Sequence, residues 1–118
     1  MNPRNLPVFS AIGLICLSFA GCKPKPPADE HVRVVMKRYS IDPPVIRVTS
    51  GKRIELEVTT ADVQHGLDIP ALEIKEPVHP GRTTIIDFQA PAPGEYKVAC
   101  GVLCGPHHDD MVGKLVAQ

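Results

Sequence analysis

A cluster of soft metal-binding side chains lies near the C-terminal end of the sequence. Within the twelve residues "CGVLCGPHHDDM", the chain carries Cys100, Cys104, His107, His108 and Met111. Thiolate, imidazole and thioether groups suit copper, whereas calcium and magnesium take oxygen ligands. The residue types and their spacing therefore indicate a copper site built largely from one short segment.

Two kinds of copper site fit these residues. A mononuclear blue-copper site needs one cysteine, two histidines and a weakly bound methionine. Cys104, His108 and Met111 supply three of these, and His65 in "TTADVQHGLDIP" is the candidate for the fourth. Cys100 then has no role, so the alternative is a dinuclear site in which both thiolates bridge two ions. Without metal, the two cysteines would instead form a disulfide, because an exported protein meets oxidising conditions.

The segments that must position this cluster have the patterns of β-strands. Ile54, Leu56 and Val58 alternate with polar residues, which predicts a strand with one buried face. Further strand-like segments, separated by turns rich in Pro and Gly, cover residues 31–40, 45–49, 83–88, 95–100 and 113–118. Thirteen prolines and the lack of a helical period favour an antiparallel β-sandwich. The cluster would then lie on the loop between the last two strands.

The N-terminal part has the composition of an export signal followed by a tether. Residues 1–21 combine Arg4, an apolar run and small residues, as in a secretory signal, and the run is too short to span a membrane comfortably. The sequence "FAGC" resembles a bacterial lipobox, which implies a lipid anchor at Cys22. Residues 22–30, rich in proline and charge, predict a semi-extended tether. We therefore expect an exported, membrane-anchored domain over residues 31–118 that faces the periplasm or the cell exterior.

The spacing of the ligand candidates is the signature of a known family. Cys-x3-Cys-x3-His-x2-Met, with an upstream Asp-Val-x-His and the stretch "HPGRTTIIDFQAPAPGEYKVAC", resembles the CuA domain of cytochrome c oxidase subunit II. The resemblance covers roughly residues 41–116. It implies a Greek-key β-sandwich of the cupredoxin type that binds two copper ions.

The resemblance also assigns a role to each ligand. It implies two bridging thiolates, two terminal imidazoles, a weak axial carbonyl and a weak axial thioether, from Cys100 and Cys104, His65 and His108, Val102, and Met111 respectively. Many relatives carry an aromatic residue near the upstream histidine for electron entry. This sequence has Leu67 and Asp68 in that neighbourhood.

These assignments imply an electron-transfer protein with no catalytic site of its own. By the resemblance, its donor would be a c-type cytochrome or a similar protein, and its acceptor a terminal oxidase. Three alternatives remain: a copper-delivery lipoprotein, a mononuclear blue-copper carrier, and a metal-free sandwich with a disulfide. Thirteen basic and thirteen acidic residues balance, so the charge does not indicate a nucleic-acid partner.

Overall fold

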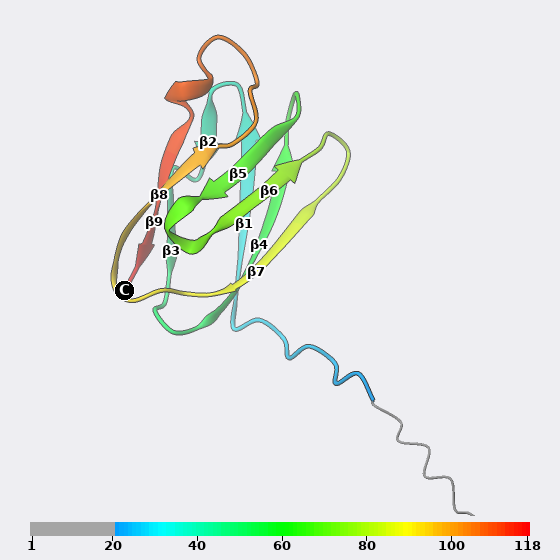
Figure 1. Ribbon diagram of the computed structural model, residues 1–118, viewed down its shortest axis with the longest axis vertical. Coiled ribbons are helices and arrows are strands. Elements are labelled where there is room, and N and C mark those ends of the chain that lie inside the picture. The colour runs from blue at the N-terminus through cyan, green and yellow to red at the C-terminus, as the bar shows by residue number, and fades with distance from the viewer. Residues whose placement is uncertain (1–20) are drawn as a thin grey trace, which may run out of the picture.

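The computed structural model describes residues 21–118, which form a two-layer β-sandwich preceded by an extended segment (Figure 1). Residues 1–20, and with them almost all of the predicted signal, lie outside the described residues. Residues 21–28 contain no helix or strand, and Cys22 is exposed within them. In the described part of the chain, no helix is long and apolar enough to cross a membrane.

The strands divide into a sheet of four and a sheet of five. The first sheet has the order β2-β1-β4-β7, and its strands are β1 (Glu30–Lys37), β2 (Ser40–Asp42), β4 (Arg53–Thr60) and β7 (Thr84–Gln89). The second has the order β3-β9-β8-β5-β6, and its strands are β3 (Val45–Val48), β5 (His65–Ile69), β6 (Ile74–Val78), β8 (Gly94–Cys100) and β9 (Val112–Ala117). Two short 3-10 helices, η1 (Pro70–Leu72) and η2 (His108–Asp110), complete the described elements.

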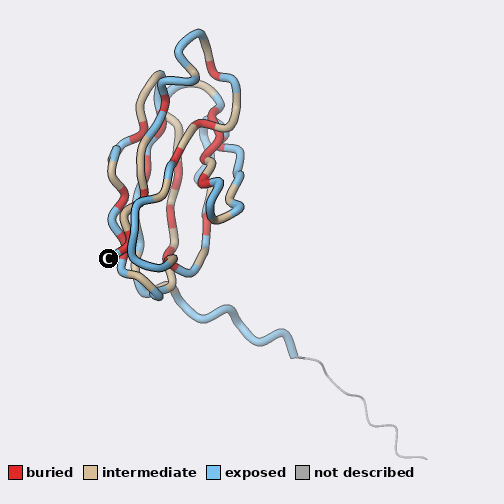
Figure 2. Tube along the Cα trace, turned by 60° about the vertical axis from the view of Figure 1, so that its left-hand side comes forward, coloured by how far each residue is buried: buried red, intermediate tan, exposed pale blue. Residues whose placement is uncertain are grey.

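The core lies between the two sheets and consists mainly of aliphatic side chains. Ile54, Leu56 and Val58 of β4 are fully buried, while the residues between them are only half-buried, as the alternation predicts. Met36 of β1 is also fully buried. Figure 2 shows the same alternation of buried and more exposed residues along the strands. Each large aliphatic side chain buried in this way contributes about 1.5–3 kcal/mol to folding.

The predicted β-sandwich is confirmed, but it is not purely antiparallel, because two strand pairs are parallel. β1 runs parallel to β4, with His31 opposite Glu55, and β3 runs parallel to β9, with Ile46 opposite Leu115. Parallel neighbours need a crossover connection rather than a tight hairpin. Here the chain leaves the first sheet after β2, forms β3 in the second sheet, and returns as β4. This change of sheet is invisible to a period-two pattern, which reports only which face of a strand is buried.

Three strands, β2, β5 and β6, were not predicted. Four of the five residues of β5 are buried, so the strand shows no alternation, and His65 is its first residue rather than part of a loop. β6 contains Pro77 and lies at the edge of its sheet, where a residue without an N–H group is tolerated. β5 matters for function, because it pairs directly with β8 next to Cys100.

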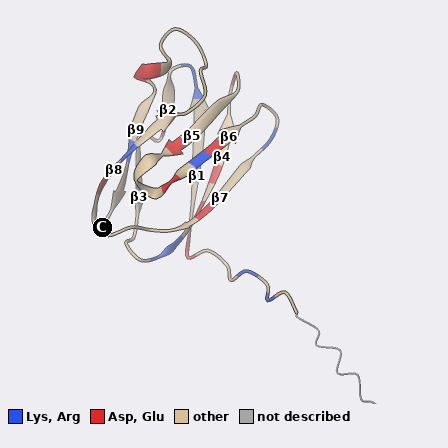
Figure 3. Cartoon of the chain, in the orientation of Figure 1, with Lys and Arg blue, Asp and Glu red and all other residues tan. Residues whose placement is uncertain are grey.

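The segment between β8 and β9 lies at one end of the sandwich, and the N-terminal segment leaves from the other end (Figure 1). Asp29 fixes the start of the fold, since its N–H donates to the carbonyl of Arg53 at 2.8 Å and its carboxylate accepts from the N–H of Arg53 at 2.9 Å. Basic and acidic residues are interspersed over the strands (Figure 3). The fold therefore presents the cysteine-bearing end far from the point where the N-terminal segment is attached.

Candidate metal centre

The fold brings together the two segments that carry the predicted ligands. Cys100 is the last residue of β8, where it lies opposite Leu67 of β5. The N–H of Gly101 donates to the carbonyl of Gly66 at 2.9 Å, which holds the start of the β8–β9 segment against β5. The segment closes on itself where the N–H of Cys100 donates to the carbonyl of Met111 at 3.1 Å. Strand pairing thus places the residue before Gly66, His65, beside the cysteines.

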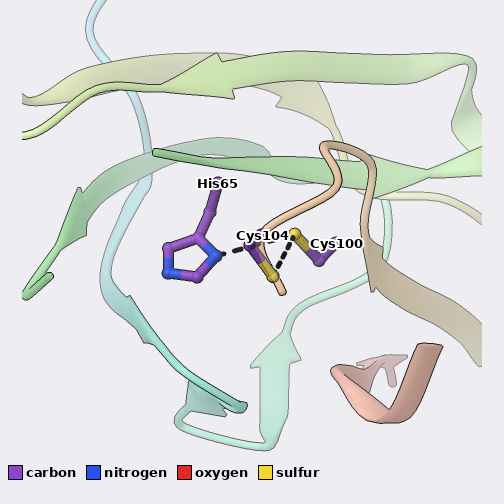
Figure 4. A group of neighbouring side chains, drawn as sticks. All are labelled: His65, Cys100 and Cys104. Atoms are coloured by element: carbon purple, nitrogen blue, oxygen red, sulfur yellow. Dashed lines mark hydrogen bonds between the residues drawn. The ribbon is translucent and has the colours of Figure 1, made fainter. Parts of the chain in front are cut away.

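The donor atoms form two matching groups around the pair of sulfurs, and Figure 4 shows His65 of the first group beside the two cysteines. The two Sγ atoms of Cys100 and Cys104 are 3.8 Å apart. Cys100 Sγ lies 3.7 Å from His65 Nδ1, and Cys104 Sγ lies 3.7 Å from His108 Nδ1. Each thiol therefore faces an imidazole of its own, one from β5 and one from η2.

Each group also includes one weaker donor. The carbonyl oxygen of Val102 lies 3.1 Å from Cys100 Sγ, and the thioether sulfur of Met111 lies 3.5 Å from Cys104 Sγ. Metal–donor bonds of about 2.0–2.3 Å leave two donors on one ion about 3–4 Å apart. All five distances fall in this range, so the residues fit a soft metal ion at each of the two groups.

Most of the centre is buried, although His108 and Val102 are only half-buried. His65 and Met111 are fully buried, and Cys100 and Cys104 are each 6% exposed. Among the described residues, His65 is the one polar or charged residue that belongs to the buried core. A buried imidazole carries a large cost unless both ring nitrogens have partners. A hydrogen-bond partner at Nε2 and a ligand at Nδ1 would together meet this requirement.

Asp62 provides the partner for Nε2 of His65, at 2.8 Å from its Oδ1. Burial raises the pKa of the Asp62 carboxyl, but hydrogen bonds from the N–H of Arg38, the ring of His65 and the N–H of Val63 outweigh it and hold the pKa well below its usual range. The carboxylate is therefore ionised at neutral pH and accepts the Nε2 proton. This fixes the tautomer that leaves Nδ1 free towards Cys100.

The cysteines are free thiols, and their surroundings favour the neutral form of Cys104. Burial raises the pKa of the Cys104 thiol, and the neighbouring Cys100 raises it further. A soft cation displaces thiol protons when it binds, so the same burial that disfavours a lone thiolate favours a thiolate paired with a metal.

The other three histidines of the chain, His31, His79 and His107, lie outside this centre. His107 is exposed and stacks edge-on against Tyr39, with ring centroids 5.2 Å apart, so the chain turns His108 and not His107 towards Cys104. His79 is exposed, and His31 contacts Glu55 on the outer face of β1. Neither of these two histidines is a neighbour of the thiols.

Three residues near the centre had no role in the sequence analysis: Arg38, Tyr39 and Asp62. Asp62 belongs to the Asp-Val-x-His motif, so its three-residue spacing from His65 was a usable signal. Arg38 and Tyr39 follow β1, more than sixty residues before the cysteines, and no pattern links them to the cluster. The neighbourhood of His65 in sequence lacks an aromatic residue, but the fold brings Tyr39 against the β8–β9 segment.

Comparisons with known proteins identify the family of this chain. A family model described as a cupredoxin-like domain matches residues 10–117. Cytochrome c oxidase subunit 2 of Thermus thermophilus is 30% identical over 92 residues, which are 78% of this chain and 68% of the relative. Cytochrome c oxidase subunit 2 of a Synechocystis species is 41% identical over 58 residues, which are 49% of this chain but 18% of the relative. The chain thus spans only part of the length of these relatives.

Solved structures show the same fold. The periplasmic domain of subunit II of cytochrome oxidase from Bradyrhizobium japonicum superposes with a TM-score of 0.72 at 24% identity, covering 79% of this chain and 86% of that one. Auracyanin A, a "blue" copper protein from Chloroflexus aurantiacus, superposes with a TM-score of 0.63 at 20% identity, covering 75% of this chain and 98% of that one. These likenesses establish the cupredoxin-type β-sandwich.

Proposed function

This chain belongs to the cupredoxin-like family as a relative of cytochrome c oxidase subunit II, and from this premise we propose that it is an electron-transfer protein with a dinuclear copper centre. Copper binding and electron transfer follow from the family. The dinuclear centre is supported by one observation above all: two buried thiols 3.8 Å apart each face a separate imidazole nitrogen at 3.7 Å. A mononuclear centre would need only one of the two thiols.

The proposed ligands are those of the two donor groups. One ion would take His65 and the carbonyl of Val102, the other His108 and Met111, and both would share the thiolates of Cys100 and Cys104. When bound, the copper pair supplies a one-electron couple whose charge is shared between two metals. The chain's own residues exclude water, hold His65 through Asp62, and fix the donors on paired strands.

The rigid scaffold suits electron transfer better than turnover of a substrate. The ligands at the ends of β8 and β5 are held by the sheet, so their positions change little when the charge of the centre changes. No buried nucleophile or general base is needed beyond the ligands themselves. The part played by the protein is to keep one geometry through both oxidation states.

We further propose the cellular setting. Residues 1–21 act as an export signal, Cys22 carries a lipid, and residues 22–30 tether the domain of residues 31–118 to the membrane on its periplasmic or outer side. The donor is a c-type cytochrome or a similar protein, and the acceptor is a terminal oxidase. The names of the relatives support the oxidase, and the exposed position of Cys22 is compatible with the anchor.

Electron paramagnetic resonance of the copper-loaded chain from residue 22 onward tests the centre. We expect two copper ions per chain and hyperfine structure from one electron shared by two equivalent nuclei. Cys100→Ser should abolish this signal. A localised single-copper signal that survives Cys100→Ser would replace the proposal with a blue-copper carrier. Copper that leaves the chain on reduction would point instead to a delivery protein.

A further inference from the structure

Arg38 lies in the turn between β1 and β2, at the same end of the sandwich as the cysteines. It has no ligand atom for a soft metal, yet it contacts both segments that carry the proposed ligands. Its Nε donates to the carbonyl of Cys104 at 2.9 Å, and its main-chain N–H donates to Oδ2 of Asp62 at 2.7 Å. We propose that Arg38 is a positioning residue that holds the two ligand-bearing segments in register with each other, a role that rests on the proposed copper function.

The first connection passes through Asp62. The carboxylate uses one oxygen for the N–H of Arg38 and the other for the ring of His65. The N–H of Val63 also donates to the carboxylate, at 2.6 Å. The turn after β1 therefore fixes the carboxylate that in turn fixes the imidazole of His65.

The second connection passes through the guanidinium group. In the described part of the chain, it is the hydrogen bond that ties residues 102–107 to an element outside the β8–β9 segment and its ends. The other hydrogen bonds of these residues stay within the segment, such as the N–H of His108 to the carbonyl of Gly105 at 3.1 Å. Arg38 thus holds the main chain of Cys104 through its carbonyl, and this helps to fix the position of the Cys104 sulfur.

Packing by the neighbouring residue reinforces this contact. Tyr39 lies so close to Gly105 that a Cβ atom there would come within 2.5 Å of the phenol oxygen. Gly105 also has φ of 149°, a conformation that other residues rarely adopt. The turn after β1 therefore covers the outer side of the ligand segment, and Arg38 supplies its polar anchor.

The positive charge gives a second, separable effect. A cation near the centre opposes the more positive, oxidised state of the copper, so it favours reduction. Arg38 is exposed, so solvent and salt screen this effect. We therefore expect the loss of anchoring to dominate, with a lower reduction potential as a smaller, salt-dependent consequence.

The test compares Arg38→Gln and Arg38→Lys with Arg33→Gln, which removes an exposed arginine from the middle of β1, where its Nε donates to Glu57 at 3.2 Å. In copper-free protein, the hydrogen-bonded amides of Gly101, His108 and Met111, which lie at the two ends of the β8–β9 segment, should exchange about tenfold faster in Arg38→Gln, in line with the loss of one charge-assisted hydrogen bond. Exchange within β4 should stay unchanged. Arg33→Gln should match the original chain in both regions.

In copper-loaded protein, Arg38→Gln should lose copper to a chelator about tenfold faster and should show a lower potential at low salt. Arg38→Lys should keep the reduction potential of the original chain but should lose copper as fast as Arg38→Gln, because an ammonium cannot reproduce the reach and planar geometry of the guanidinium. Unchanged exchange in Arg38→Gln, or faster exchange in β4 as well, would overturn the proposal. If the original chain binds no copper, the proposed function fails, while the exchange experiment still decides whether Arg38 anchors the segment.

Discussion

Replacing Asp62 tests whether the carboxylate behind His65 organises the metal centre. Asp62→Asn keeps an oxygen acceptor of the same size but removes the charge, and Asp62→Ala removes both. The bond to be lost joins Oδ1 to Nε2 of His65 at 2.8 Å, where the ring is fully buried and the Asp62 side chain is 33% exposed. The two variants therefore separate the effect of the charge from that of the hydrogen bond.

The expected magnitude follows from the nature of this bond. A hydrogen bond to a charged group contributes about 1.5–3 kcal/mol, and partial exposure of the carboxylate places this one near the lower end. We expect Asp62→Ala to weaken copper binding by about 2 kcal/mol, or about 30-fold, within the range usual for groups behind a metal-bound histidine. Asp62→Asn should retain part of the orientation and lose less, about tenfold.

Competition with a chelator of known copper affinity measures this difference directly. Gln64→Ala is a matched control, because it alters the same connection between β4 and β5 but has no hydrogen bond to His65 among the contacts of the described residues. Circular dichroism before loading shows whether each variant is folded. Equal copper affinity in Asp62→Ala and the original chain would refute the view that Asp62 sets the tautomer and direction of His65.

Three further predictions concern the fold and its titration. Leu56→Ala should lower the free energy of unfolding by about 2–5 kcal/mol in denaturant titrations because Leu56 is fully buried, whereas Leu103→Ala, at a side chain 81% exposed, should change it by less than about 0.5 kcal/mol. Copper at 100 times its dissociation constant should stabilise the fold by about 2.7 kcal/mol in thermal unfolding, and the double variant Cys100→Ser/Cys104→Ser should remove this gain. The depressed pKa of Asp62 gives the copper-free chain stability that is present above about pH 4, the unfolded value, and is lost as the pH falls through the lower folded value. The difference in stability between Asp62→Asn and the original chain should therefore become smaller as the pH falls. A difference that stays constant would contradict the depressed pKa of Asp62.

Local sequence patterns were enough to predict the strands that bury one face and expose the other. β4 alternates between buried and half-buried residues, and turns with Pro or Gly mark its neighbours, so the β-sandwich class followed from the sequence. β5 was not predicted because nearly all of its residues are buried, so its sequence shows no alternation. The parallel pairing of β1 with β4 was not predicted for another reason: the direction of pairing depends on where the chain crosses from one sheet to the other.

The ligand candidates were accessible because most of them lie within one short segment with a distinctive spacing. The residues that orient them were not. Arg38 contacts Cys104 across 66 positions of sequence, and a lone arginine at the end of a strand normally indicates no more than a solvated side chain. Asp62 was the intermediate case, because its spacing from His65 was visible but the direction of its carboxylate was not.

The two sheets supply different groups to the centre, and this explains why the residues that orient the ligands come from distant parts of the chain. The five-stranded sheet carries the proposed ligands, at the ends of β5 and β8 and in the segment before β9. The groups that orient them come from the other sheet, in the turn after β1 and the connection after β4. The geometry of the centre therefore depends on how the two sheets pack, and not only on the segment that holds the cysteines. A core substitution such as Leu56→Ala, remote from the donors, should consequently loosen copper binding as well as the fold, whereas an exposed change such as Leu103→Ala, made within the ligand segment itself, should affect copper binding much less.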